Sequence, residues 1–202
     1  MPPVTRILLA ICVVVFLIDL LMGQRLTQLF ALYPLDLSNQ LPEHFRFKPW
    51  QLITYAFLHG GISHLLLNML MLVMFGAALE HYWGGQRFLI FYLVSAVGAA
   101  LVQLVASEYM LGSTQQVTSV IGASGALFAV LVGYGMHFPN QRVMLLIPPI
   151  PMKARTLVIL FAVLQIVLGF TGWMPDTAIF THIGGLVIGF LLVKFWLKPR
   201  RH

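Results

Sequence analysis

Residues 122–138 read Gly-Ala-Ser-Gly-Ala-Leu-Phe-Ala-Val-Leu-Val-Gly-Tyr-Gly-Met-His-Phe, an apolar run that opens on a serine between two small residues. As a helix, its part from 124 to 138 would rise only about 22 Å, against a bilayer hydrocarbon core of about 30 Å. If the far end reaches one membrane surface, Ser124 lies below the other. The run therefore predicts a short, submerged helix that carries a hydroxyl at membrane depth.

The composition of the whole chain agrees with a membrane environment. Hydrophobic residues make up 59% of the 202 residues and charged residues only 9%, whereas a soluble domain carries roughly 25% charged residues. Most of the surface therefore cannot face water, and the lipid bilayer is the alternative solvent. High hydrophobicity with low charge also excludes a disordered chain.

Six apolar runs could form membrane helices, and the fourth is the short one described above. We expect an all-α polytopic membrane protein that forms a single domain over 1–202, without a separate soluble domain. Arg6 precedes a first run that is long for a signal peptide and lacks a small-x-small cleavage site, so we expect a retained helix. The expected spans are 4–22, 51–79, 87–106, 124–138, 155–171 and 178–197.

The net charge of +6 reflects membrane orientation. Six crossings put both termini on one side, and most basic residues fall on that side, which the positive-inside rule assigns to the cytoplasm. We expect no nucleic-acid partner, because the basic residues flank apolar runs instead of forming a separate basic patch. The absence of a further targeting segment fits a bacterial inner membrane, with the site open to the periplasm. The basic residues near the ends of apolar runs are Arg6, Arg87, Arg142, Lys153, Arg155, Lys194, Lys198, Arg200 and Arg201.

Two loops on the outer side have unusual compositions. The first, about 23–50, mixes apolar and polar residues, which predicts a structured segment half-embedded at the membrane surface rather than an ordinary loop. The third, 107–123, feeds the submerged helix and must dip below the surface. Its polar residues (Gln115, Gln116, Thr118 and Ser119) are tolerated there only beside protein or a water-filled cavity. The sequence thus predicts a wet pocket that opens outward.

Four polar residues inside the spans are candidates for a functional site, because such residues are costly in lipid. His64 and Asn68 lie four apart on one face of the second span, Ser124 opens the fourth, and His182 lies at the start of the sixth. The second, fourth and sixth spans all run inward from the outer face. We therefore expect the four side chains to converge in the outer half of one cavity.

These residue types predict acyl-transfer chemistry. A serine hydroxyl needs an adjacent base, and a neutral histidine can take its proton and return it to the leaving amine. No acidic residue is well placed behind His182, so we expect a Ser124–His182 dyad. The Ser124 amide at a helix N-terminus, with His64 and Asn68, can bind the developing oxyanion.

Ordinary structural roles compete with each signal taken alone. Glycines such as Gly122 and Gly125 permit a tight turn and close approach of a substrate, yet G-x-S-G matches are also common where membrane helices pack. A lone histidine can be a satisfied core residue or a metal ligand. Without a cysteine or carboxylate cluster nearby, we expect neither a metal nor another cofactor.

As a set, the motifs closely resemble the rhomboid family of intramembrane proteases across about 50–197. The family patterns are H-x-x-x-N in the second helix, G-x-S-G opening the fourth, H-x-x-G-x-x-x-G in the sixth and E-x-x-x-G after the second. The matching residues here are His64 and Asn68, Gly122 to Gly125, His182 with Gly185 and Gly189, and Glu80 with Gly84.

The resemblance implies a six-helix bundle and a serine endopeptidase. It implies that Ser124 is the nucleophile, that His182 is the base, and that His64, Asn68 and the Ser124 amide form the oxyanion hole. Substrates would be single-span membrane proteins, cut within or near the bilayer after a small residue. The third loop and the fifth span would govern substrate entry.

The chain departs from the family pattern at two positions. Some members have a tyrosine one turn after the serine, and here that residue is Phe128, whose ring can stack on His182 but offers no hydroxyl. The first loop often carries a Trp-Arg pair, and here the pair is Trp50 and Gln51. Neither departure removes a catalytic group.

Two other functions remain open from the sequence. A non-catalytic rhomboid-like protein would bind or escort membrane clients, although such relatives usually lack the serine or the histidine. A small transporter or channel would need a polar midplane, and the chain shows no inverted repeat and no midplane carboxylate.

Overall fold

The structure is a computed structural model that describes residues 1–39, 41–114, 119–146, 149–171 and 179–196. It is mostly helical, and it adds one two-stranded hairpin. The elements are α1 (Pro3–Leu21), α2 (Arg25–Phe30), η1 (Glu43–Phe45), α3 (Gln51–Thr54), η2 (Tyr55–Phe57), α4 (Ile62–Met71), η3 (Leu72–Gly76), α5 (Ala77–Trp83), α6 (Gly85–Thr114), α7 (Ser124–His137), β1 (Arg142–Leu146), β2 (Pro149–Lys153), α8 (Ala154–Thr171) and α9 (Ile179–Phe195).

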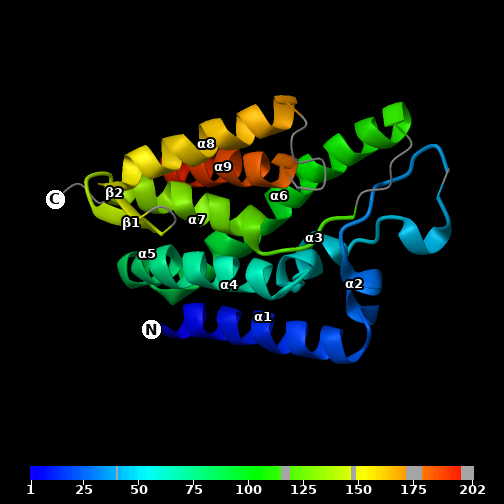
Figure 1. The fold of residues 1–202 in the computed structure, drawn as a ribbon, viewed down its shortest axis with the longest axis horizontal. Helices are drawn as coiled ribbons and strands as arrows, with labels where there is room; N and C mark the ends of the chain where they lie inside the picture. Colours follow the sequence, from blue (N-terminus) through cyan, green and yellow to red (C-terminus); the bar gives the residue numbers. More distant parts are fainter. Residues whose placement is uncertain (40, 115–118, 147–148, 172–178, 197–202) are drawn as a thin grey trace.

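Helix α7 lies in the middle of the bundle, between the α4–α5 segment on one side and α8 with α9 on the other (Figure 1). Every residue from Gly125 to Gly135 is buried. A short helix that is apolar on all sides reaches its lowest free energy when other helices surround it. Ser124 therefore begins a helix that has no lipid-facing side.

The second apolar run forms several consecutive elements. The expected span starts at 51, whereas the long helix starts at Ile62, after the short elements α3 and η2. It then runs to Trp83, with one π-helical stretch, η3, between α4 and α5. The late start places His64 in the first turn of α4, close to the loop that precedes Ser124.

Helix α6 is longer than the sequence analysis predicts. The expected third span ends at 106 and the expected loop covers 107–123, but α6 continues to Thr114. Leu111 in the extension is buried, so packing continues the helix past the expected membrane boundary. Gln115, Gln116 and Thr118 of the expected loop lie outside the described residues.

A hairpin joins α7 to α8, where the all-α expectation has only a loop. Strand β1 pairs antiparallel with β2, from Arg142 opposite Lys153 to Leu146 opposite Pro149. The hairpin and the N-terminus lie at one end of the bundle, whereas α2 and α3 lie at the other (Figure 1).

Three described helical segments are long and apolar enough to cross a membrane: Pro3–Leu21, Ile62–Trp83 and Gly85–Gly112. The remaining apolar helices, 124–137, 154–168 and 179–195, are shorter. The chain is thus an integral, multi-pass membrane protein.

Two carboxylates near the membrane surfaces cap helices. Glu80 accepts hydrogen bonds from the Val4 and Thr5 amides, at 2.8 and 2.6 Å, and from the Thr5 hydroxyl at 2.7 Å. Asp19 accepts from the amides of Leu26 and Thr27 at the start of α2. Negative charge at a helix N-terminus is favourable, so these contacts hold α1 and α2 against their neighbours.

The first loop is structured and tied to the bundle. Gln51, in the place of the family's arginine, accepts from the amides of Tyr33 and Lys48 through its buried Oε1. Glu108 of α6 accepts from the amides of Asp36 and Leu37 at 2.9 and 3.0 Å. Gln51 and Glu108 therefore tie the loop to α3 and α6, and Arg46 braces it from within through a 2.9 Å ion pair with Asp36.

Glycines on α9 bring it close to two helices. A Cβ on Gly185 would collide with the carbonyl oxygen of Gly125, and one on Gly189 would lie 2.6 Å from the Ala129 Cα. Gly184 instead faces α6, where a Cβ would lie 3.1 Å from the Ala99 Cα. Helix α9 therefore packs closely against α7, and this packing carries His182 to the start of α7.

Candidate functional site

The segment before Ser124 is held by backbone hydrogen bonds from two distant parts of the chain. Leu32 and Val120 form an isolated antiparallel bridge with two hydrogen bonds of 2.9 Å, and the Gly122 amide donates to the Tyr55 carbonyl at 2.9 Å. Gly122 has a φ of 126°, a backbone conformation that other residues rarely adopt. The chain therefore turns at Gly122, and α7 begins at Ser124.

Ser124 and His182 are in direct contact. The Ser124 hydroxyl lies 2.8 Å from His182 Nε2, although the residues are 58 positions apart in the chain. This is the distance of a good hydrogen bond between a hydroxyl and a ring nitrogen. Both side chains are half-buried, so the pair is sheltered and still reachable.

The other ring nitrogen of His182 contacts a residue that the sequence analysis does not single out. His182 Nδ1 lies 2.9 Å from Gln165 Oε1 of α8. An amide oxygen can only accept, so Nδ1 carries the proton. Nε2 is then unprotonated and accepts the Ser124 hydroxyl. The orientation of His182 thus rests on a hydrogen bond as well as on packing.

Phe128 packs against the face of the imidazole. The two rings are stacked, with centroids 4.4 Å apart and planes 24° from parallel. Phe161 of α8 meets the Phe128 ring edge-on at 6.1 Å. The stack and the Gln165 contact together hold the plane of the His182 ring.

His64 approaches the same space from α4. The Gly60 amide donates to His64 Nδ1 at 3.4 Å, which leaves Nε2 as a donor. A Cβ on Gly122 would lie 2.8 Å from His64 Nε2 and 3.7 Å from Ser124 Oγ. The two atoms therefore border one small space, kept open by the missing Gly122 side chain.

Asn68 lies one turn after His64 and supplies a free donor. Its side chain is only 4% exposed, and its Nδ2 has no hydrogen-bond partner in the described part of the chain. An unpaired buried amide costs roughly 1–3 kcal/mol. Such an atom needs an explanation, and a ligand that accepts its hydrogen bond is one.

Gly125 faces neighbouring helices. A Cβ there would lie 2.7 Å from Thr181 Cγ2 and 2.9 Å from Ala99 Cβ. Gln103 of α6 in turn accepts from the Thr181 amide at 3.1 Å and hydroxyl at 2.8 Å. Gly125 and Gln103 together seat the residue that precedes His182.

His59 lies behind His64, with the ring centroids 5.1 Å apart in an edge-on arrangement. It is 3% exposed, and neither of its ring nitrogens has a hydrogen-bond partner among the described residues. Within the same residues, no group of three or more His, Cys, Asp or Glu side chains could hold a metal ion.

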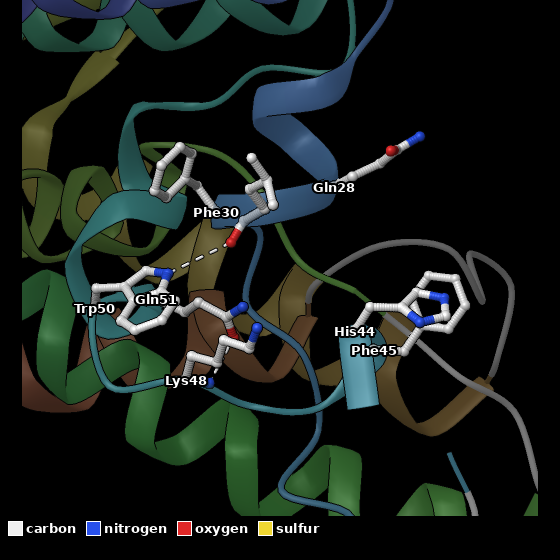
Figure 2. A pocket seen from close by; sticks show the side chains of 8 residues that line it. Gln28, Phe30, His44, Phe45, Lys48, Trp50 and Gln51 are labelled. Atoms are coloured by element: carbon white, nitrogen blue, oxygen red, sulfur yellow. Dashed lines mark hydrogen bonds between the residues drawn. The ribbon is translucent and has the colours of Figure 1, made fainter. Parts of the chain in front are cut away.

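A separate cavity of about 520 Å³ lies in the first loop. Figure 2 shows its lining, with the Trp50 indole turned toward α2, where its nitrogen donates to the Leu29 carbonyl at 3.4 Å. None of the candidate site residues lines it. Its lining residues are Gln28, Leu29, Phe30, His44, Phe45, Lys48, Trp50 and Gln51.

The residues that sequence reasoning missed are the two glutamines, Gln103 and Gln165. Each lies inside an expected apolar span, where an amide side chain needs a hydrogen-bond partner. That signal is present in the sequence. The partner of each glutamine cannot be identified from the sequence, because it depends on how each helix is rotated.

Comparison with known proteins identifies the family. A model described as the Rhomboid domain matches residues 46–199. RHOMBOID-like protein 4 of Arabidopsis thaliana is 36% identical over 154 residues, which is 76% of this chain and 35% of that protein. Rhomboid protease GlpG of Salmonella typhi is 30% identical over 192 residues, 93% of this chain and 60% of that protein. The chain thus spans about a third to three fifths of the length of these relatives. The chain belongs to the rhomboid family.

Proposed function

We propose that the chain is an intramembrane serine endopeptidase that cleaves membrane proteins with a Ser124–His182 dyad. The observation that carries this proposal is the 2.8 Å contact between Ser124 Oγ and His182 Nε2 at the start of a buried helix. Family membership and the protease named among the relatives support it.

In the first step, His182 Nε2 takes the hydroxyl proton while Ser124 Oγ attacks the substrate carbonyl carbon. The tetrahedral intermediate collapses when His182 returns that proton to the leaving amine. An acyl group then remains on Ser124 Oγ. Water then attacks this ester while His182 Nε2 takes its proton. The second intermediate collapses when His182 gives that proton to Ser124 Oγ, which breaks the ester bond and releases the new C-terminus.

The oxyanion of each intermediate needs donors near Ser124. Helical hydrogen bonding in α7 starts with the Leu127 amide, which donates to Ala123, so the Ser124 amide is not used within the helix. His64 Nε2 and Asn68 Nδ2 add donors from α4. One such donor is typically worth about 2.7–4 kcal/mol in the transition state, which gives the unpaired Asn68 amide a purpose.

We further propose that both termini face the cytoplasm and that the site opens to the periplasmic side of a bacterial inner membrane. The N-terminus and the hairpin, which carries the paired basic residues Arg142 and Lys153, lie at the opposite end of the bundle from α2 and α3. Substrates are transmembrane proteins, cut within or near the bilayer at a locally unwound segment.

The test is cleavage of a single-span substrate by the reconstituted protein. Ser124→Ala and His182→Ala should each abolish cleavage, while both proteins keep the wild-type helical content. Ser38→Ala and His81→Ala are matched controls, because both residues are exposed, and they should cleave normally. Undiminished cleavage in either dyad variant would contradict the assignment.

Labelling with a serine-directed phosphonate separates this proposal from the non-catalytic, client-binding alternative. A catalytic dyad should place one label on Ser124 of the folded wild-type protein and none on His182→Ala. Absence of the label, together with capture of uncleaved membrane clients, would support the alternative.

A further inference from the structure

One face of helix α8 packs against His182, and much of the remaining helix surface is exposed. Gln165 is 8% exposed and contacts His182, while Phe161, four residues earlier on the same face, packs against Phe128. Six large apolar side chains elsewhere on α8 are 45–61% exposed: Ile159, Leu160, Val163, Leu164, Ile166 and Val167.

An amide inside an apolar helix needs a hydrogen-bond partner, and Gln165 has one in the imidazole. Its oxygen faces a nitrogen that must carry a proton if the opposite nitrogen is to act as a base. In serine proteases with a triad, a carboxylate at this position selects the tautomer and stabilises the imidazolium. A neutral amide selects the same tautomer without placing a charge in a medium of low polarity.

We propose that Gln165 is the positioning residue for His182, so that the base is correctly oriented only while α8 is docked against α9 and α7. The inference rests on the proposed protease function. Gln165 touches neither Ser124 nor the reacting atoms, and it acts through the tautomer and the ring orientation of His182.

The kinetic test replaces Gln165 with leucine and with glutamate. Gln165→Leu removes the acceptor at similar size and should lower kcat about 10- to 100-fold, because a hydrogen bond to a group that becomes charged is lost. KM should change less than about twofold, since no substrate contact is removed. Gln165→Glu still offers an oxygen to Nδ1 in either protonation state and should recover most of the lost rate.

The matched control lies on α1, which carries none of the site residues. Leu17→Ala changes a side chain that is 51% exposed and should retain the wild-type kcat and phosphonate labelling rate. Gln165→Leu should label Ser124 more slowly in proportion to its kcat. Its thermal unfolding temperature should change little, because burial of an apolar side chain in place of an amide offsets the hydrogen bond that His182 Nδ1 loses.

A second measurement does not depend on catalysis. Nitrogen NMR of labelled histidine, assigned by the signal lost in His182→Ala, should show the Nδ1–H tautomer in the wild type and a mixture in Gln165→Leu. A folded Gln165→Leu protein with wild-type kcat and an unchanged tautomer would overturn the proposal, as would a Gln165→Glu protein as slow as Gln165→Leu. If the wild type itself neither cleaves nor labels, the protease function fails, and the tautomer still tests Gln165.

Discussion

Ser124 gains its chemical setting from residues that have no reactive group. Gly122 lets the chain turn and leaves space for His64, and Phe128 supports the ring of His182. Gln165 completes the hydrogen bonding of that ring. The reactivity of one hydroxyl therefore depends on a glycine, an aromatic ring and an amide as much as on the base.

Gly122→Ala should reduce kcat/KM at least about a hundredfold, because the new methyl group displaces His64 and a shift of about 1 Å at an active site has that effect. The Cβ would lie 2.8 Å from His64 Nε2, and the residue must also keep a φ of 126°. The measurement is cleavage of a reconstituted substrate.

Gly23→Ala is a control for a methyl group added to a glycine away from the site. Gly23 also has a positive φ, of 62°, but its Cβ would meet nothing within 4 Å. The variant should cleave at the wild-type rate. An equal loss there would show that a general effect of the added methyl group, rather than contact with His64, lowers the activity.

At the scale of elements, the close packing of α9 on α7 brings the base to the nucleophile. Gly185 and Gly189 face α7, and Gly184 faces α6. Small residues at such crossings let helix backbones approach and gain van der Waals contact. The glycines after His182 thus set the distance between α9 and α7.

Gly189→Ala should lower the free energy of unfolding by about 1–3 kcal/mol, the usual cost of overpacking a close contact. Its Cβ would lie 2.8 Å from the Cβ of Ala129. Unfolding of the purified protein in mixed micelles would measure the change. Gly112→Ala adds the same methyl group in open space on α6 and should not lower stability, since alanine is the better helix former. A similar loss there would argue against the packing explanation.

At the scale of the whole molecule, polar contacts at the membrane boundaries hold the peripheral parts on the central bundle. Glu80 at one end fixes the start of α1, and Asp19, Glu108 and Gln51 at the other fix α2 and the first loop. The Leu32–Val120 bridge continues this chain of contacts to the segment before Ser124. The outer loop and the site are therefore one connected structure.

Glu80→Ala should lower the free energy of unfolding by about 1–3 kcal/mol, because buried donors of α1 lose their acceptor. Glu80→Gln keeps one acceptor oxygen and should lose less. Glu43→Ala, an exposed acidic residue in η1, should have no effect. Unfolding in mixed micelles gives all three values, and equal stability of Glu80→Ala and the wild type would contradict a role in holding α1.

The sequence by itself determined the membrane class, the helical bundle and the rhomboid family. Hydropathy is a local property, and each of the motifs around His64, Ser124 and His182 lies within a short stretch of sequence. Both signals can therefore be recognised without knowing which distant residues meet. Other features were not predictable in the same way: the hairpin, the extension of α6 and the late start of α4 depend on packing beyond the local pattern.

Only the tertiary structure decided what His182 Nδ1 contacts. Gln165 and His182 are 17 residues apart on different helices, and their meeting depends on the rotation and close approach of α8 and α9. A sequence shows that a buried amide needs a partner, but many partners satisfy that need equally. The packing of α8 against α9 and α7 selects one of them, and it brings Gln165 to the base that faces Ser124.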